Sequence, residues 1–249
     1  MRARGDLSHG ARQWLHYDGS VDFVLENTVV GRAPLVPEIE LHLAHEVTEL
    51  WTATESWLAA RAVEPPFWAF AWAGGQAVAR HLLDHPTLVR GKTVVDVASG
   101  GGIVAIAAAL AGAARVIAVD PDALAAVARA HNARLNGVTL ETRTMRAEDF
   151  TDAVEVVTAG DVFYDAKMTA ALLPWLRERA SSALVLMGDP GRAYRPEGLT
   201  RVASYRTPVE QALEGKLQLD GTVYSFGEPS LKPLPVNVPV PVPVPDRRR

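Results

Sequence analysis

Short runs of β-branched residues alternate with longer alanine- and leucine-rich stretches between about residues 66 and 228. Runs of this kind predict buried strands, and the stretches between them predict helices. Five strands are predicted at residues 92–98, 115–120, 139–145, 154–163 and 182–189. Helices are predicted at residues 103–113, 123–135 and 167–180, the last with Pro174 as a kink. Two further runs, 198–206 and 221–226, predict an antiparallel pair that closes the sheet. The alternation therefore predicts an α/β fold: a seven-stranded, mostly parallel sheet with helices on both faces.

The ends of the chain have a different character. Residues 1–65 have a mixed pattern and predict an N-terminal elaboration of the domain at 66–228. Residues 229–249 carry proline at alternate positions, which excludes a helix or an inner strand. We expect this tail to be disordered, with a docking peptide as the alternative.

Composition narrows the classes of function. The chain has 249 residues, 48% of them hydrophobic, and a formal charge of -4. This balance argues against a general nucleic-acid binder. The absence of cysteine excludes disulfides and thiolate metal sites, and the histidines are too scattered to predict a metal site. Without a secretory signal or a membrane-length apolar run, we expect a cytoplasmic protein, monomeric and with no membrane partner.

Candidate chemistry gathers where the first predicted strand ends. Asp96 lies inside that strand and a glycine-rich turn follows at 98–102. Glycine lets the backbone approach a ligand closely, and in open parallel sheets nucleotide ligands bind at this edge. Asp120 ends the next strand, where a carboxylate can accept hydrogen bonds from two ribose hydroxyls. The turn also fits a dinucleotide fingerprint, but the charge of Asp96 favours a cationic sulfonium cofactor over a pyrophosphate. A turn with no ligand is the third alternative.

The segments VVDVASGGG and RVIAVDPD together resemble class I methyltransferases. With PPFWAFAWAGGQ, AGDVFYD and MGDPGR, residues 64–228 are similar to the electron transfer flavoprotein β-subunit lysine methyltransferase family, within the family 16 protein methyltransferases. The resemblance implies a Rossmann-like, seven-stranded class I methyltransferase sheet and S-adenosyl-L-methionine as cofactor. The resemblance departs from the common pattern at Ala98, which replaces the first glycine of the loop.

The resemblance also implies roles for particular residues. The cofactor's methionine part would contact the loop residues Asp96, Ala98, Ser99, Gly100 and Gly102. Asp120 would hold its ribose, Glu148 and Asp149 would contact its adenine, and Trp72 would pack beside the cofactor. Asp161 and Tyr164 match the family's D-x-x-Y signature on the substrate side and are the predicted catalytic residues, while residues 188–192 would border the same mouth. In each case a structural role is the alternative: a helix cap for Asp161, core packing for Trp72, and a solvated pair for Glu148 and Asp149.

The predicted function is that of an S-adenosylmethionine-dependent protein-lysine N-methyltransferase, with the electron transfer flavoprotein β subunit as substrate. Asp161 would dock the substrate ammonium, and Tyr164 would form a hydrogen bond and a wall of the channel. A ribosomal protein or a small amine is the nearest alternative substrate. An NAD-dependent oxidoreductase and a non-catalytic binding protein are the alternative classes.

Overall fold

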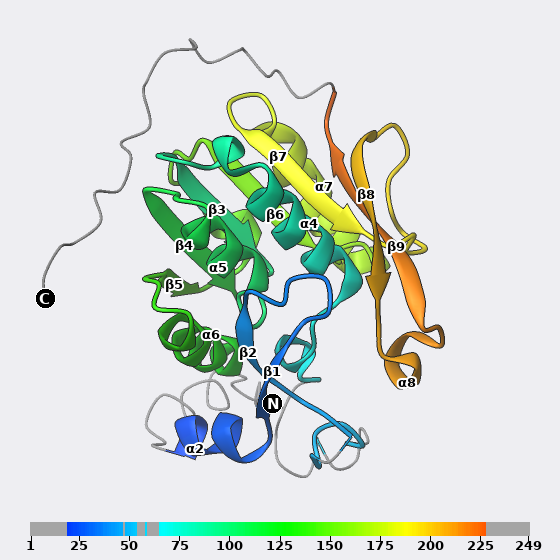
Figure 1. Ribbon diagram of the computed structural model, residues 1–249. Helices are drawn as coiled ribbons and strands as arrows, with labels where there is room; N and C mark the ends of the chain where they lie inside the picture. Colours follow the sequence, from blue (N-terminus) through cyan, green and yellow to red (C-terminus); the bar gives the residue numbers. More distant parts are fainter. Residues whose placement is uncertain (1–18, 47, 54–57, 59–64, 228–249) are drawn as a thin grey trace, which may run out of the picture.

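The computed structural model describes residues 19–46, 48–53, 58 and 65–227. The main sheet has seven strands in the order β5-β4-β3-β6-β7-β9-β8 (Figure 1). Its strands are β3 Thr93–Val97, β4 Arg115–Asp120, β5 Glu141–Thr144, β6 Val156–Gly160, β7 Leu184–Asp189, β8 Thr200–Pro208 and β9 Gln218–Ser225. The first five in sheet order run parallel, and β9 is antiparallel to both of its neighbours. The predicted sheet with its antiparallel C-terminal pair is therefore confirmed.

Alternate residues of each central strand pack into two separate cores. Val94 of β3 belongs to a cluster with α4 and α5, whereas Val95 and Val97 belong to a cluster with Trp175 and Leu176 of α7. This alternation follows from the two-residue period of a strand. Helices therefore cover both faces of the sheet, and Figure 1 shows α4 and α5 on one face and α7 on the other. The α-helices of the domain are α4 Ala73–Asp84, α5 Ile103–Leu110, α6 Ala123–Leu135, α7 Ala166–Arg179 and the short α8 Gln211–Glu214.

Only the strand predicted at 115–120 has the observed bounds, and the other predicted strands differ from the structure by a few residues at one or both ends. The run predicted as a strand over 154–163 forms β6 only to Gly160, because Asp161 has a φ of 56° and turns the chain out of the sheet. In the last pair, β8 lies two residues later than predicted, at Thr200–Pro208, and β9 begins earlier than predicted, at Gln218. The turn at Asp161 matters most, because it decides which residues after β6 reach the edge of the sheet.

Some elements were not predicted from the sequence. Helix α4 was missed because two glycines near its start, Gly74 and Gly75, weaken its intrinsic helix propensity. A separate antiparallel pair, β1 Val29–Arg32 and β2 Glu40–Leu43, follows α2 Gly19–Glu26 within the predicted N-terminal elaboration. Short 3-10 turns lie at η2 Phe67–Ala69, η3 Pro86–Leu88 and η4 Ala147–Asp149. The predicted tail at 229–249 lies outside the described residues.

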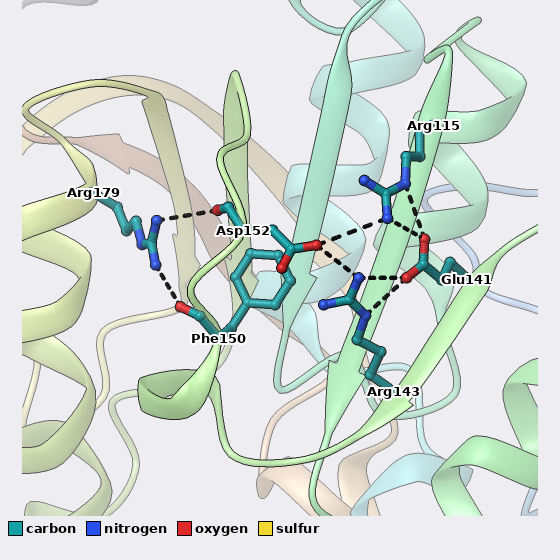
Figure 2. A network of polar contacts seen from close by, with 6 residues as sticks. All are labelled: Arg115, Glu141, Arg143, Phe150, Asp152 and Arg179. Atoms are coloured by element: carbon teal, nitrogen blue, oxygen red, sulfur yellow. Dashed lines mark hydrogen bonds and ion pairs between the residues drawn. The ribbon is translucent and has the colours of Figure 1, made fainter.

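The segment that returns from η4 to β6 is held by arginines on both sides (Figure 2). Arg143 lies over the ring of Phe150 and donates to Asp152 and Glu141, while Arg115 also donates to Glu141. From α7, Arg179 donates to the carbonyl oxygens of Phe150 and Asp152. Phe150 itself is fully buried. These contacts fix the segment that follows η4, the turn containing Glu148 and Asp149.

Glycines allow α4 to approach the ends of β6 and β7 closely. A Cβ on Gly160 would lie 2.6 Å from the Cα of Gly75, and one on Gly188 would overlap the carbonyl oxygen of Gly74. No side chain fits in either place, so the start of α4 packs directly against the backbone of β6 and β7. In the part of the chain that the structure describes, no helix is both long and apolar enough to cross a membrane.

We predict that Gly188→Ala lowers the free energy of unfolding by about 1–3 kcal/mol, the usual cost of overpacking a close contact. Urea unfolding monitored by tryptophan fluorescence measures the change. Gly75→Ala is the matched control, because its Cβ would meet only Ile103 at 3.4 Å and alanine favours a helix. Equal stabilities for wild type and Gly188→Ala would contradict the described seating of α4.

Candidate functional site at the carboxyl edge of the sheet

The loop after β3 turns through three residues with a positive φ. These are Ala98 at 50°, Gly100 at 50° and Gly102 at 89°, and Gly102 begins α5 as its N-cap. Alanine in this left-handed region costs roughly 1–2 kcal/mol, so the loop adopts its shape against a local penalty. The replacement of glycine by Ala98 therefore has not straightened the turn.

Asp96 lies underneath this loop. Its carboxylate accepts hydrogen bonds from the hydroxyls of Ser99 at 2.6 Å and Thr158 at 2.8 Å, and only 1% of the residue is exposed. Burial raises the pKa of Asp96 to about 6, while the two hydroxyl donors and the nearby Arg129 oppose that shift. The structure thus brings Asp96 and Ser99 together, and through them joins β3 to β6 and to the loop.

Asp120 links the end of β4 to the same loop. One of its carboxylate oxygens accepts the backbone N–H of Gly100 at 2.9 Å, and the other accepts that of Asp122 at 2.9 Å. A carboxylate offers about four acceptor positions, so roughly two remain open. The side chain is only partly buried, and it can accept further donors from a ligand in the crevice, as two adjacent ribose hydroxyls would supply.

Arg129 of α6 is a buried cation beneath the loop that the sequence did not single out. Its guanidinium donates to the carbonyl oxygen of Gly100 at 3.0 Å, and its stem would contact any Cβ on Gly102. Burial lowers the pKa of Arg129, but the carboxylates of Asp120, Asp96 and Asp122 oppose this. The sequence held one signal for this role: Arg129 lies on the alanine-rich face of α6, which is the buried face of the helix.

Asn132, one turn later in α6, connects the loop to the N-terminal strand pair. Its amide donates to the carbonyl oxygen of Gly101 at 2.8 Å, and its side-chain oxygen accepts the N–H of His42 at 2.7 Å. The backbone of Trp68 also lies against the loop, because a Cβ on Gly101 would meet its carbonyl oxygen. The N-terminal strand pair and the segment before α4 therefore both help to shape the crevice.

Asp161 lies at the end of β6 and is 7% exposed. One carboxylate oxygen accepts the N–H of Gly74 at the start of α4, and the other accepts Nε of Arg192 at 2.8 Å. Burial raises the pKa of Asp161 to about 6, against the lowering effect of Arg192 and of the Gly74 N–H. The helix that follows is capped instead by Asp165, which accepts the N–H of Met168.

Arg192 joins Asp161 to a second acid that the sequence analysis missed. Its two terminal nitrogens donate to both oxygens of Glu214 in α8, at 2.9 and 2.8 Å. Asp189 shapes the same loop, since its Oδ1 accepts the N–H groups of Gly191 and Arg192. Residues 188–192 therefore do lie beside Asp161. Glu214 carried no signal, because only the tertiary structure brings the β8–β9 connection to this edge.

An aromatic group lies beside these acids. The rings of Tyr164 and Phe67 are 5.4 Å apart, and the rings of Phe67 and Trp72 are 6.1 Å apart. Trp72 immediately precedes α4, is partly buried, and lies under Arg192 at 5.9 Å. Burial raises the pKa of Tyr164, and the charges of Asp165 and Asp120 raise it further. Tyr164 is therefore close enough to Asp120 to feel its charge.

Glu148 and Asp149 lie in η4, after the strand that pairs with β4. Glu148 is partly buried and forms an ion pair with Arg146 at 2.7 Å, whereas Asp149 is exposed. The backbone link from Met145 N–H to the carbonyl oxygen of Asp120 keeps this turn beside the crevice. Their predicted contact with an adenine stays a prediction.

A separate cavity of about 350 Å³ lies near the N-terminal strand pair, lined by Val29, His45, Glu46, Trp51 and Glu210. It shares no lining residue with the glycine loop or with the acids at the ends of β4 and β6.

We predict that Asp96→Asn becomes more stable relative to wild type as the pH rises from about 4 to about 6. The pKa of Asp96 is about 6 in the folded protein against an ordinary value of 3.8. The folded state therefore binds the proton more tightly, and raising the pH through this window removes stability from the wild type only. Above pH 6 the stability difference between Asp96→Asn and the wild type becomes constant. It is then about 2–3 kcal/mol larger than at pH 4.

Urea unfolding of both proteins at pH 4, 5, 6 and 7 measures this difference, and other titrating groups cancel because both proteins contain them. Asp220→Asn, at an exposed position, is the control and should show a flat difference. A pH-independent difference for Asp96→Asn would show that the burial of this carboxylate has no such cost.

Comparisons with known proteins give a consistent result. The family described as "Ribosomal protein L11 methyltransferase (PrmA)" matches residues 81–164. The electron transfer flavoprotein beta subunit lysine methyltransferase of Xenopus laevis is 37% identical over 216 residues, which cover 82% of this chain and 85% of that protein. The protein of the same name from Danio rerio is 36% identical and covers 79% and 81%. The ribosomal protein L11 methyltransferase of Yersinia pseudotuberculosis is 35% identical over 53% of this chain but only 41% of its own length.

Proposed function

The chain belongs to the electron transfer flavoprotein β-subunit lysine methyltransferase family, and from this premise we propose that it methylates lysine side chains of the electron transfer flavoprotein β subunit. It is an S-adenosylmethionine-dependent protein methyltransferase. The main support for the proposed substrate is the 37% identity to the Xenopus laevis protein over most of both chains. We place the reaction in the cytoplasm as part of the same proposal.

The residues at the glycine loop suit S-adenosylmethionine. The open acceptor positions of Asp120 match the two hydroxyls of a ribose, and the glycine turn at 98–102 lies directly beside them. Asp96 adds a negative charge below the loop, which suits a cationic ligand better than a pyrophosphate. We propose Asp120 for the ribose, the loop for the methionine part, and Glu148 with Asp149 for the side of the adenine.

When bound, the cofactor supplies a methyl group on a positively charged sulfur, which a neutral amine can take in line with the departing sulfur. Neutralising a lysine with a pKa of about 10.4 at pH 7 costs roughly 4–5 kcal/mol. The chain must therefore attract the ammonium to the site and then help it to lose a proton. Desolvation of the amine is the ordinary way to reduce that cost.

The acids around Asp161 supply the attraction. Asp161 and Glu214 share the single guanidinium of Arg192, so the two carboxylates and one cation leave one formal negative charge when both acids are ionised. In the structure both oxygens of Asp161 already accept a donor, so an incoming ammonium would share this carboxylate with Arg192. We propose that Asp161 orients the substrate as one member of this network, and that Tyr164 lines the path.

A second candidate substrate is a ribosomal protein. The match of residues 81–164 to the ribosomal protein L11 methyltransferase family favours it. That match covers the cofactor loop and the D-x-x-Y segment but stops before the loop that contains Arg192. It therefore supports the shared methyl transfer more than a shared substrate.

We predict that Asp120→Ala weakens binding of S-adenosylhomocysteine by roughly 10- to 100-fold, the effect of losing hydrogen bonds to a charged acceptor, about 1.5–3 kcal/mol. Isothermal titration calorimetry measures the dissociation constant. Asp220→Ala removes an exposed acid from the far strand and is the control, with wild-type affinity. Wild-type affinity in Asp120→Ala would contradict the ribose assignment.

We predict that Asp161→Ala keeps the wild-type affinity for S-adenosylhomocysteine within about twofold and lowers turnover by at least about 10-fold. Incorporation of labelled methyl groups into the purified β subunit measures turnover. Asp161→Asn separates charge from structure, because its amide oxygen can still accept the Gly74 N–H. Full activity in Asp161→Ala would refute a role for this carboxylate in the reaction.

A further inference from the structure

Three aromatic side chains of the described residues are both large and exposed: Phe67, Tyr164 and Tyr194. They come from different parts of the chain, yet Phe67 and Tyr164 lie in contact with their rings 5.4 Å apart. Tyr194 is connected to the same region, since its N–H donates to the carbonyl oxygen of Phe163. Exposed aromatic side chains thus gather at the edge that carries Asp161.

The exposure of Phe67 is not the result of a loosely held backbone. Its carbonyl oxygen accepts Nε1 of Trp72 at 2.8 Å, and its own N–H donates to the carbonyl oxygen of Pro65 at 2.8 Å. Trp68 and Ala69, next to it in η2, are fully or almost fully buried. The fold therefore holds Phe67 in place with 49% of its surface exposed to solvent. Leaving this apolar surface unburied forgoes part of the stability that its burial would give.

The pair of Phe67 and Tyr164 is connected to both acids proposed for cofactor and substrate, by charge to one and by ring contacts to the other. On one side, the charge of Asp120 contributes to the raised pKa of Tyr164. On the other side, Phe67 contacts Trp72, whose ring lies under Arg192, the partner of Asp161. The aromatic pair is therefore joined through Trp72 to the ion pair of Arg192 and Asp161.

We propose that Phe67 contacts the substrate lysine directly and, with Tyr164, forms an aromatic wall of the path by which that side chain reaches the transferred methyl group. This inference rests on the proposed function and adds a substrate-contacting residue to it. Phe67 belongs to neither the glycine loop nor the D-x-x-Y segment, and it comes from the connection that precedes α4.

The chemistry of lysine favours such a wall. Its four methylene groups gain by burial against aromatic rings, and its ammonium is attracted to the ring face. Exclusion of water by two rings also lowers the pKa of the amine, which a carboxylate alone would raise. Methylation removes N–H donors but keeps the positive charge, so an aromatic wall still attracts a partly methylated lysine.

The test compares Phe67→Ala, Phe67→Tyr and the control Leu110→Ala with the wild type. Leu110 is a similarly exposed apolar side chain at the opposite end of α5 from the glycine loop. Initial rates with purified electron transfer flavoprotein β subunit give kcat and KM, calorimetry gives the dissociation constant for S-adenosylhomocysteine, and thermal unfolding verifies the fold.

We expect Phe67→Ala to lower kcat/KM for the protein substrate by roughly 10-fold, within the range of a lost cation–π and packing contact. Affinity for S-adenosylhomocysteine should stay within about twofold, and Phe67→Tyr should recover most of the rate because it keeps the ring. Leu110→Ala should match the wild type. An unchanged kcat/KM in Phe67→Ala overturns the proposal, as does a loss fully explained by weaker S-adenosylhomocysteine binding.

Failure of the proposed function gives a different result. If the wild type itself does not methylate the β subunit, the proposed substrate is wrong, and the variants are then compared on the proteins that the wild type labels in a cell extract. Reduced labelling by Phe67→Ala, with recovery in Phe67→Tyr, still supports the aromatic wall. Equal labelling by Phe67→Ala and wild type refutes it.

Discussion

The carboxylate of Asp120 holds the N–H groups of Gly100 and Asp122, and the shape of the crevice depends on this contact. It fixes the end of β4 against the loop after β3, so two neighbouring strand ends present one continuous surface. The loop contains three residues with a positive φ, one of them an alanine, which would not hold this shape alone. Arg129 and Asn132 support the loop from the opposite side through the carbonyl oxygens of Gly100 and Gly101.

Asp161 provides a matching constraint at the end of β6. It accepts the N–H of Gly74 in the first turn of α4 and also holds Arg192, so one carboxylate positions a helix and a loop. The close approach that makes this possible needs glycine at 74, 160 and 188, because a Cβ at any of them would overlap a neighbour. The edges of the crevice at β4 and at β6 are therefore built alike, since at each a strand-end acid accepts backbone N–H groups.

This construction has a cost. Burial raises the pKa of both Asp96 and Asp161 to about 6, which means that the folded protein holds two carboxylates in surroundings that disfavour their charge. The exposed ring of Phe67 and the left-handed Ala98 add to that cost. Such features persist where function needs them, and here they all border the same edge of the sheet.

The sequence by itself determined the mostly parallel sheet with its antiparallel C-terminal pair, and it pointed to the loop after β3 as the candidate cofactor site. The runs of β-branched residues and the glycine turn after the first strand are local patterns, and the contacts among Asp96, Ser99, Gly100 and Asp120 form at the ends of the strands that these patterns predict. Helix α4 and the strand pair β1–β2 were missed, because glycine and short runs give weak local signals. Glu214, Arg129 and Phe67 reached the site only through tertiary structure. Their positions depend on how the β8–β9 connection, α6 and the segment before α4 pack on the sheet, and no local pattern encodes contacts between segments so far apart in the chain.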